Sequence, residues 1–282
     1  MPSFHAPDGT ELAYHMLGDG APLICLPGGP MRASAYLGDL GGLARDRQLV
    51  RLDLRGTGES AVPADPSSYR CDRLVEDVAA LMDYLGLESA DLLAHSAGAN
   101  IAVQYALRYR PRVRKLALIT PSGRAVDLEP DAEMRREIVK LRQGEPWFTA
   151  AAAAFERIAA GQGDDHDWEA MSPFFYGRWD AAAQAHDAAG EQQVNEAAAA
   201  EFGALGAFDP STARAALAEL DAPVLVLGGD LDLQRPPRIT AEFAALFPHP
   251  RLVFQPGAGH FPWLDDPGWF VSAVNAFFDS AP

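Results

Sequence analysis

Ser96 stands in a sequence context that would make its hydroxyl a nucleophile. The apolar run that starts at Asp91 ends abruptly in Ala94-His95-Ser96-Ala97-Gly98, and a helical pattern follows. A small-x-Ser-x-Gly string between a strand and a helix predicts a sharp turn that strains the backbone of the serine and exposes its side chain above the sheet edge. Only small neighbours fit beside such a turn, and Ala94 and Gly98 meet that requirement.

A serine hydroxyl needs a base to accept its proton, and the base needs an acid to orient it. Two later loops carry these residue types, each directly after a predicted strand. The strand at 224–227 leads into Gly228-Gly229-Asp230-Leu231-Asp232, and the strand at 252–254 leads into Pro256-Gly257-Ala258-Gly259-His260. Because open parallel sheets bind ligands at the carboxyl ends of their strands, we expect both loops to meet Ser96. His260 is the candidate base, and Asp230 and Asp232 are candidate acids.

The elements that would hold these residues alternate between short apolar runs and longer amphipathic ones. Helical spacing of apolar residues is clearest in the segment 70–87, and a second helix follows at 97–108. Strands joined by crossover helices imply an α/β fold with a mostly parallel central sheet flanked by helices. Strands are expected at 11–17, 22–26, 48–54, 90–94, 115–120, 223–227 and 251–255, and further helices at 237–247 and 267–278.

The pattern changes between residues 124 and 214, where no strand-like run occurs. Alanine runs at 150–154 and 197–200 lie inside helical patterns, and a loop signal separates helices at 161–167. Residues 125–214 hold 17 acidic and 7 basic side chains, a net charge of −10. We interpret this region as an all-helical cap inserted into the sheet domain, so that residues 1–123 and 215–282 form the domain and 124–214 the insertion.

Taken together, the three motifs resemble the α/β-hydrolases that carry a helical cap, and the resemblance covers nearly all of the sheet domain. Aligning the family's Gly-x-x-Asp loop places its acid on Asp232, with Asp230 as the weaker candidate, and its Gly-x-Gly-His element places the base on His260. Attack on a carbonyl creates an oxyanion that requires prearranged N–H donors. The resemblance assigns these donors to the backbone of Ala97 and of Gly29, in the loop Pro27-Gly28-Gly29-Pro30. Pro27 stands where the family usually has His, a change that leaves backbone donation intact.

The block from Asp53 to Ser60 also matches a family signature, Asp-x-Arg-Gly-x-Gly-x-Ser. We interpret it as structural, with Asp53 and Arg55 bracing the loops beside the site. The resemblance implies no metal and no cofactor, and no His, Cys or carboxylate spacing in the sequence suggests zinc.

A serine at the turn favours cleavage of an ester, thioester or amide through an acyl-enzyme, as in carboxylesterases. Gly28-Gly29-Pro30 and the block from Asp53 are also similar to proline iminopeptidases, which implies acidic cap residues that hold the substrate's free ammonium. Glu191, Glu196 and Glu201 are available for that role. Met31 replaces that family's Gly, and the serine motif differs from its Gly-Gly-Ser-Trp-Gly, so this activity is the alternative.

Aromatic residues of the cap could line an apolar acyl pocket, and Phe174, Phe175 and Tyr176 are the leading cluster. The substrate would then be a small molecule or a short peptide. A different class of function is a non-catalytic ligand-binding protein on the same fold, although a receptor has no need of a complete Ser96, Asp232 and His260 set.

The whole chain of 282 residues carries a formal net charge of −16. Such a charge repels phosphate backbones and anionic lipid surfaces, which argues against nucleic-acid and membrane partners. The first 15 residues lack the basic and apolar regions of a secretory signal, so we expect a cytoplasmic protein. Cys25 and Cys71 are expected to be unpaired. Nothing in the sequence indicates an oligomeric state.

Overall fold

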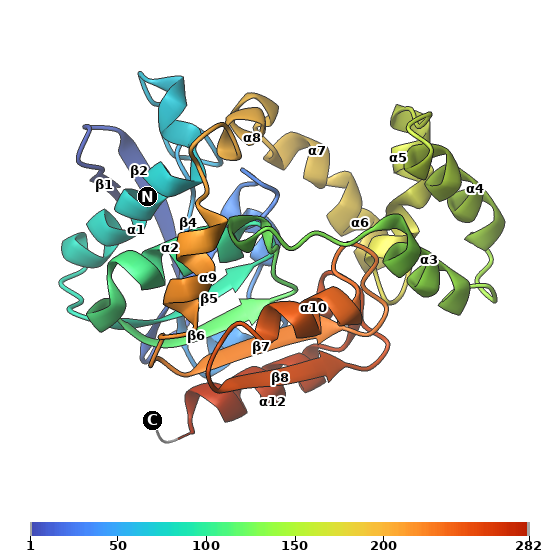
Figure 1. Ribbon diagram of the computed structural model, residues 1–282. Coiled ribbons are helices and arrows are strands. Elements are labelled where there is room, and N and C mark those ends of the chain that lie inside the picture. Colours follow the sequence, from blue (N-terminus) through green and yellow to red (C-terminus); the bar gives the residue numbers. More distant parts are fainter. Residues whose placement is uncertain (1, 281–282) are drawn as a thin grey trace.

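An eight-stranded sheet organises the computed structural model, which describes residues 2–280 (Figure 1). The strand order is β1-β2-β4-β3-β5-β6-β7-β8. All neighbours from β4 onward pair in parallel, whereas β1 and β2 add an antiparallel edge. The strands are β1 (Ser3–His5), β2 (Glu11–Leu17), β3 (Pro22–Leu26), β4 (Gln48–Leu52), β5 (Ala90–His95), β6 (Val113–Ile119), β7 (Val224–Gly229) and β8 (Pro250–Gln255).

Both faces of the central strands are buried, which explains their nearly continuous apolar sequence. In β3, Ile24 and Leu26 point to one core cluster while Leu23 and Cys25 point to the other. The first cluster lies under helices α1 (Cys71–Tyr84), α2 (Gly98–Arg108), α9 (Pro210–Leu217) and α10 (Pro237–Ala244). The second lies under α12 (Pro267–Phe278) and the short turns η1 (Ser34–Leu37) and η2 (Leu43–Arg45). The predicted α/β fold is therefore confirmed.

A helical region occupies the connection from β6 to β7 and rises above the carboxyl edge of the sheet (Figure 1). Within the described residues it holds no named strand. The elements are η5 (Arg124–Val126), α3 (Ala132–Leu141), α4 (Phe148–Ala159), α5 (Asp165–Met171), η6 (Ser172–Phe175), α6 (Ala181–Ala188), α7 (Gly190–Gln193) and α8 (Glu196–Phe202), followed by α9. Helices α3, α5, α6, α8 and α9 begin at side-chain caps. Asp131, Asp164, Asp180, Asn195 and Asp209 each accept a hydrogen bond from an N–H of the first turn.

The cap has a small core of its own, and its last helices pack on the sheet domain. Ile138, Phe155 and Phe174 belong to a cluster separate from the two sheet clusters. The expected boundary at 214 falls inside α9, whose Ala213 and Leu217 belong to the first sheet cluster. By packing, α9 is part of the sheet domain.

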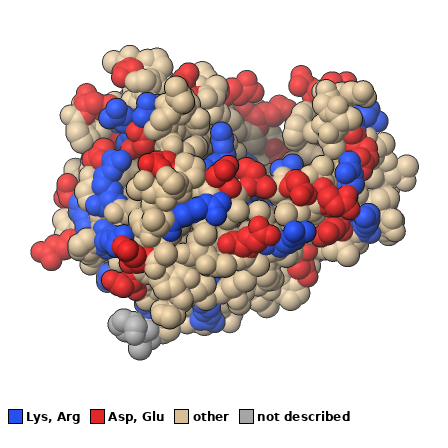
Figure 2. Space-filling model, in the orientation of Figure 1, with Lys and Arg blue, Asp and Glu red and all other residues tan. Residues whose placement is uncertain are grey.

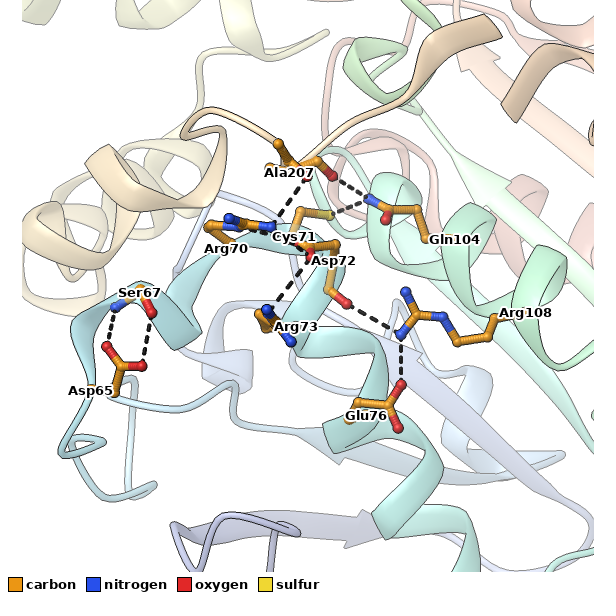
Figure 3. Close-up of polar contacts among 11 residues, drawn as sticks. Asp65, Ser67, Arg70, Cys71, Asp72, Arg73, Glu76, Gln104, Arg108 and Ala207 are labelled. Atoms are coloured by element: carbon orange, nitrogen blue, oxygen red, sulfur yellow. Dashed lines mark hydrogen bonds and ion pairs between the residues drawn. The ribbon is translucent and has the colours of Figure 1, made fainter. Parts of the chain in front are cut away.

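Polar contacts attach this returning segment to the start of α1 (Figure 3). Gln104 of α2 donates from its side-chain amide to the carbonyl of Ala207 and to the sulfur of Cys71, both at 3.2 Å. Arg70 donates to the carbonyl of Gly206 at 3.2 Å and pairs with Asp72 at 2.9 Å. These contacts hold the end of the cap over α1 and α2.

Cys25 and Cys71 are buried and unpaired, as predicted. Within residues 2–280, no helix has the length and apolarity needed to cross a membrane. The surface carries acidic side chains in excess, and Figure 2 shows them interspersed with basic ones on the face in view.

Candidate active site

Ser96 lies at the turn between β5 and α2 with a φ of +51°. This left-handed conformation is strained for a residue with a Cβ atom, as the sequence motif predicts. Its N–H donates to the carbonyl of Ile119 at 3.0 Å, which ties the turn to the neighbouring strand. A Cβ atom on Gly28 would lie 2.9 Å from that of Ser96, and one on Gly98 would lie 2.5 Å from the carbonyl oxygen of Pro27. Glycine at both positions lets the β3 loop pack directly against the turn.

The loop after β3 places Gly29 beside Ser96 and Ala97, and all three line one cavity. The preceding amide, that of Gly28, is already engaged because it donates to the hydroxyl oxygen of Tyr36 at 2.7 Å. Among the glycine amides of this loop, Gly29 is thus the one left to serve as the predicted donor.

His260 and Asp232 lie together below this turn, both buried. The Nδ1 of His260 is 2.9 Å from Oδ2 of Asp232, and Oδ1 of Asp232 accepts the backbone N–H groups of Gln234 and Arg235 at 2.8 and 3.0 Å. A carboxylate only accepts, so Nδ1 carries the proton and Nε2 presents a lone pair. Asp232 therefore orients the imidazole as a base.

Asp230, the other candidate acid, faces a different group. Its Oδ1 accepts the N–H of Gly257 at 2.7 Å, and burial raises the pKa of its carboxyl. Asp230 therefore closes the turn of the histidine loop, while Asp232 is the carboxylate in contact with His260.

Close backbone approach joins the acid loop, the histidine loop and the cap. A Cβ atom on Gly229 would clash with the carbonyl oxygens of Ala258 and Gly259. On the cap side, the N–H of His260 donates to the carbonyl of Phe175 at 2.7 Å. The position of His260 thus depends on the cap as well as on the sheet.

His95, directly before Ser96, has structural contacts that its place in the sequence motif does not reveal. Its Nδ1 is 2.7 Å from the hydroxyl of Tyr36, and its Nε2 is 2.9 Å from the carbonyl oxygen of His260. One proton arrangement satisfies both contacts: Tyr36 donates to Nδ1, and Nε2–H donates to the carbonyl. Burial, followed by the nearby His260, lowers the pKa of His95 well below its usual value, in agreement with this neutral form. The network connects the Gly28 loop to the His260 backbone.

Asp53 and Arg55 brace loops, as the sequence suggests. Asp53 accepts the N–H groups of Ser34 and Glu59 at 2.8 and 3.1 Å. Arg55 pairs with Asp77 and, at 2.6 Å, with Asp8.

Two cavities meet at Ser96. The larger, about 500 Å³, has an apolar wall formed by Phe155, Ile158, Met171, Phe202 and Leu233. The smaller, about 170 Å³, contains His260 together with Tyr36, Arg32 and Asp187. Ser96, Gly29 and Phe175 line both.

The five predicted substrate-binding residues lie in three different places in the structure. Phe175 lines both cavities at Ser96, and Tyr176 lines the smaller one. Phe174 does not line either cavity, because it is fully buried against Trp147 and Phe148 in the cap core. Glu191 and Glu196 are exposed and border an outer groove that Ser96 does not line.

The two cavities are instead lined by charged residues that the sequence did not reveal. Arg32 and Asp187 line the smaller cavity, and the larger is bordered by Arg124, Arg135 and the pair Arg235–Glu129, 3.0 Å apart. The sequence shows no sign of these residues. Arg32, Arg124 and Arg135 lie far in sequence from the serine turn, the acid loop and the histidine loop. The described residues hold no group of three or more His, Cys, Asp or Glu arranged to bind a metal.

Ser96, Asp232 and His260 lie at the carboxyl edge of a mostly parallel sheet, and a family model of the alpha/beta hydrolase fold matches residues 21–267. The chain belongs to this family. It is 26% identical to a proline iminopeptidase of Heyndrickxia coagulans over 279 residues, covering 93% of this chain and 92% of that protein. An esterase from Rhodococcus sp. ECU1013 superposes with a TM-score of 0.75 at 26% identity, over 100% of this chain and 99% of the other.

A solved proline iminopeptidase from Mycobacterium smegmatis has the same fold, with a TM-score of 0.74 at 24% identity and coverage of 98% and 97%. The relatives thus include esterases and iminopeptidases at similar, low identity. The family is established, and the choice of substrate depends on the site.

Proposed function

We propose that the protein is a serine hydrolase that cleaves a carboxylic ester through an acyl-enzyme. The observation that carries the proposal is the contact of the buried Asp232 with His260, which lines the same cavity as the strained Ser96. A ligand-binding protein would have no use for an oriented imidazole beside a strained serine.

The chemistry follows from the proton on Nδ1. Nε2 of His260 accepts the hydroxyl proton while Oγ of Ser96 attacks the carbonyl carbon. The N–H groups of Gly29 and Ala97 stabilise the oxyanion. The intermediate then collapses, the bond to the leaving oxygen breaks, and Nε2 returns the proton to that oxygen. Water attacks the acyl-enzyme by the same route and releases the acid and Ser96.

The two cavities suggest where each part of the substrate lies. The leaving oxygen receives its proton from His260, which lines only the smaller cavity. The leaving group therefore occupies the smaller cavity, and the acyl group occupies the larger one with its apolar wall.

Cleavage of N-terminal proline is the second candidate, favoured by the overall similarity to a proline iminopeptidase. In such a substrate the free ammonium belongs to the acyl group. The carboxylate on the acyl side is Glu129, which is paired with Arg235 and lies near Arg124 and Arg135. Asp187 is the carboxylate that lines the smaller cavity, and it therefore lies on the leaving-group side. This distribution of charge favours the ester.

A fluorophosphonate probe tests the nucleophile. We expect stoichiometric labelling of the wild type, none in Ser96→Ala, and an ester turnover that falls by at least about 10³-fold in that variant. A folded protein that resists labelling would support the ligand-binding alternative.

A pair of substrates then tests the reaction class. A 4-nitrophenyl ester with a short acyl chain should be hydrolysed, and a proline arylamide should not. Arylamide turnover that collapses in Glu129→Gln or Asp187→Asn would support the aminopeptidase instead.

A further inference from the structure

Arg32 is a buried cation without a carboxylate partner. The residue is 8% exposed, and its guanidinium stacks over the ring of Tyr36 at 4.5 Å. Its Nε donates to the side chain of Gln193 at 2.9 Å and its Nη2 to the carbonyl of His186 at 3.1 Å. Among residues 2–280, Nη1 has no hydrogen-bond acceptor, and no carboxylate forms an ion pair with the guanidinium. A buried charge of this kind is costly unless a ligand completes it.

Arg32 lines the smaller cavity, together with Ser96 and His260. The volume of this cavity, about 170 Å³ against about 500 Å³ for the larger cavity, suits a short polar group. Asp187 is the one carboxylate among the lining residues, and within residues 2–280 it forms no ion pair with Arg32. Over both cavities at Ser96, the lining arginines outnumber the lining carboxylates outside the proposed triad, so the formal charge of the lining side chains is positive.

This charge is opposite to that of the protein. The chain has a formal charge of −16, but the two cavities at Ser96 are lined by Arg32, Arg124, Arg135 and Arg235 against Glu129 and Asp187, apart from the proposed triad. A concave site with a local excess of one charge attracts the opposite charge. Within an acidic protein, such a site selects for an anion.

We propose that the smaller cavity is a carboxylate subsite, in which Arg32 holds the carboxylate of a short hydroxy acid whose hydroxyl is esterified by an apolar acyl chain. The proposal rests on the proposed function and names its substrate class. Ser96 attacks the acyl carbonyl, the bond to the hydroxy-acid oxygen breaks, and His260 protonates that oxygen. The hydroxy acid leaves as a carboxylate, and water releases the acyl group as a second carboxylate and one proton. The guanidinium suits the role because it binds a carboxylate by two parallel hydrogen bonds.

Two esters that differ only in charge test the subsite. We would compare kcat/KM for O-butyrylglycolate with kcat/KM for 2-(butanoyloxy)acetamide, its neutral isostere. The wild type should prefer the carboxylate ester by roughly ten- to hundred-fold in kcat/KM, and Arg32→Gln should abolish this preference. Arg32→Lys keeps the charge without the fork and should restore part of it. A wild type that treats both esters alike would overturn the proposal.

Arg32 also attaches the cap, so a control must separate anchoring from anion binding. Gln193→Ala removes one of the hydrogen bonds between Arg32 and the cap but keeps the guanidinium, and it should leave the ratio unchanged. If Gln193→Ala and Arg32→Gln reduce turnover of both esters by the same factor, Arg32 is only a brace and the subsite is wrong. Asp187→Asn should keep or raise the ratio, because it removes the remaining acidic group.

Binding to an inactive variant separates this inference from the proposed function. Calorimetry of O-butyrylglycolate with Ser96→Ala should show binding that is lost in the double variant with Arg32→Gln. Arg32-dependent binding without labelling of Ser96 would refute the hydrolase and keep the subsite. If Ser96 is labelled and simple esters are turned over but O-butyrylglycolate does not bind, the hydrolase is supported and the carboxylate subsite is refuted.

Discussion

At the scale of single residues, we expect substitution of the two aspartates of the acid loop to have very different effects on activity. Asp232→Asn should lower kcat by about 10³- to 10⁴-fold, because an amide in place of the carboxylate favours the wrong tautomer of His260. Asp230→Asn replaces an acceptor of the Gly257 N–H by another acceptor and should keep most activity. Steady-state kinetics with one short 4-nitrophenyl ester measures both. The reverse order of effects would move the acid to Asp230.

A second prediction for a single residue concerns the hydroxyl of Tyr36. Tyr36→Phe leaves the Gly28 N–H without its acceptor and His95 without its donor in a buried place. We expect the free energy of unfolding to fall by about 1–3 kcal/mol and kcat to fall as the Gly28 loop loosens. Tyr105→Phe is the matched control, because the Tyr105 hydroxyl is buried without a partner among the described residues. Urea titration should find the control neutral or stabilised, and an equal loss in both variants would contradict the network.

Local motifs and long-range contacts explain which of these residues the sequence could reveal. Ser96 and the two loops follow strands, so their residue types and order are visible in the chain, and the structure brings Asp232 and His260 together. His95 and Arg32 acquire their roles from partners such as His260 and Gln193, which are more than 150 residues away in the chain. No spacing within one segment encodes such contacts.

At the scale of elements, the strands were predictable because burial on both faces makes them continuous apolar runs. The edge strand β1 was missed, since its three residues are too few to show a pattern. The sequence showed that the cap is helical, but it did not show which of the cap side chains point towards the site. Glu191 lies in the very short α7, and no long periodic face exists there to predict which side meets Ser96.

Gly229 supplies the prediction at this scale, since the acid and histidine loops touch only if it has no side chain. Gly229→Ala introduces a methyl group against two backbone carbonyls of the histidine loop, which must move together with His260. We expect a loss of at least about 1–3 kcal/mol in unfolding free energy and a larger fractional loss of kcat/KM. Gly144→Ala is the control, because a Cβ atom there meets open space. Activity retained in Gly229→Ala would show that the two loops are not coupled.

At the scale of the whole molecule, the charge of the chain and the charge of its site have different causes. Most of the acidic excess belongs to residues 125–214, and the acidic side chains on the face in Figure 2 are exposed to water, which screens their charge. His95 is instead buried and His186 partly buried near Arg32, which favours their neutral forms. Burial and then Arg32 lower the pKa of His186 to about 4, and His95 is affected in the same direction. The fold therefore resists protonation at the junction of cap and sheet.

Stability should consequently decrease in mild acid. A histidine whose pKa is about 6.5 in the unfolded chain and about 4 in the folded one contributes fully above pH 6.5, and its contribution is lost as the pH falls towards 4. His186→Gln removes one such group, so its Tm should fall less than that of the wild type between pH 7.5 and pH 5. His166→Gln is the matched control at an exposed histidine and should follow the wild type. Burial raises the pKa of Asp187, whose contribution changes in the opposite sense, but Asp187 is common to all three proteins. Parallel pH profiles of Tm for His186→Gln and the wild type would mean that His186 already binds its proton in the folded protein.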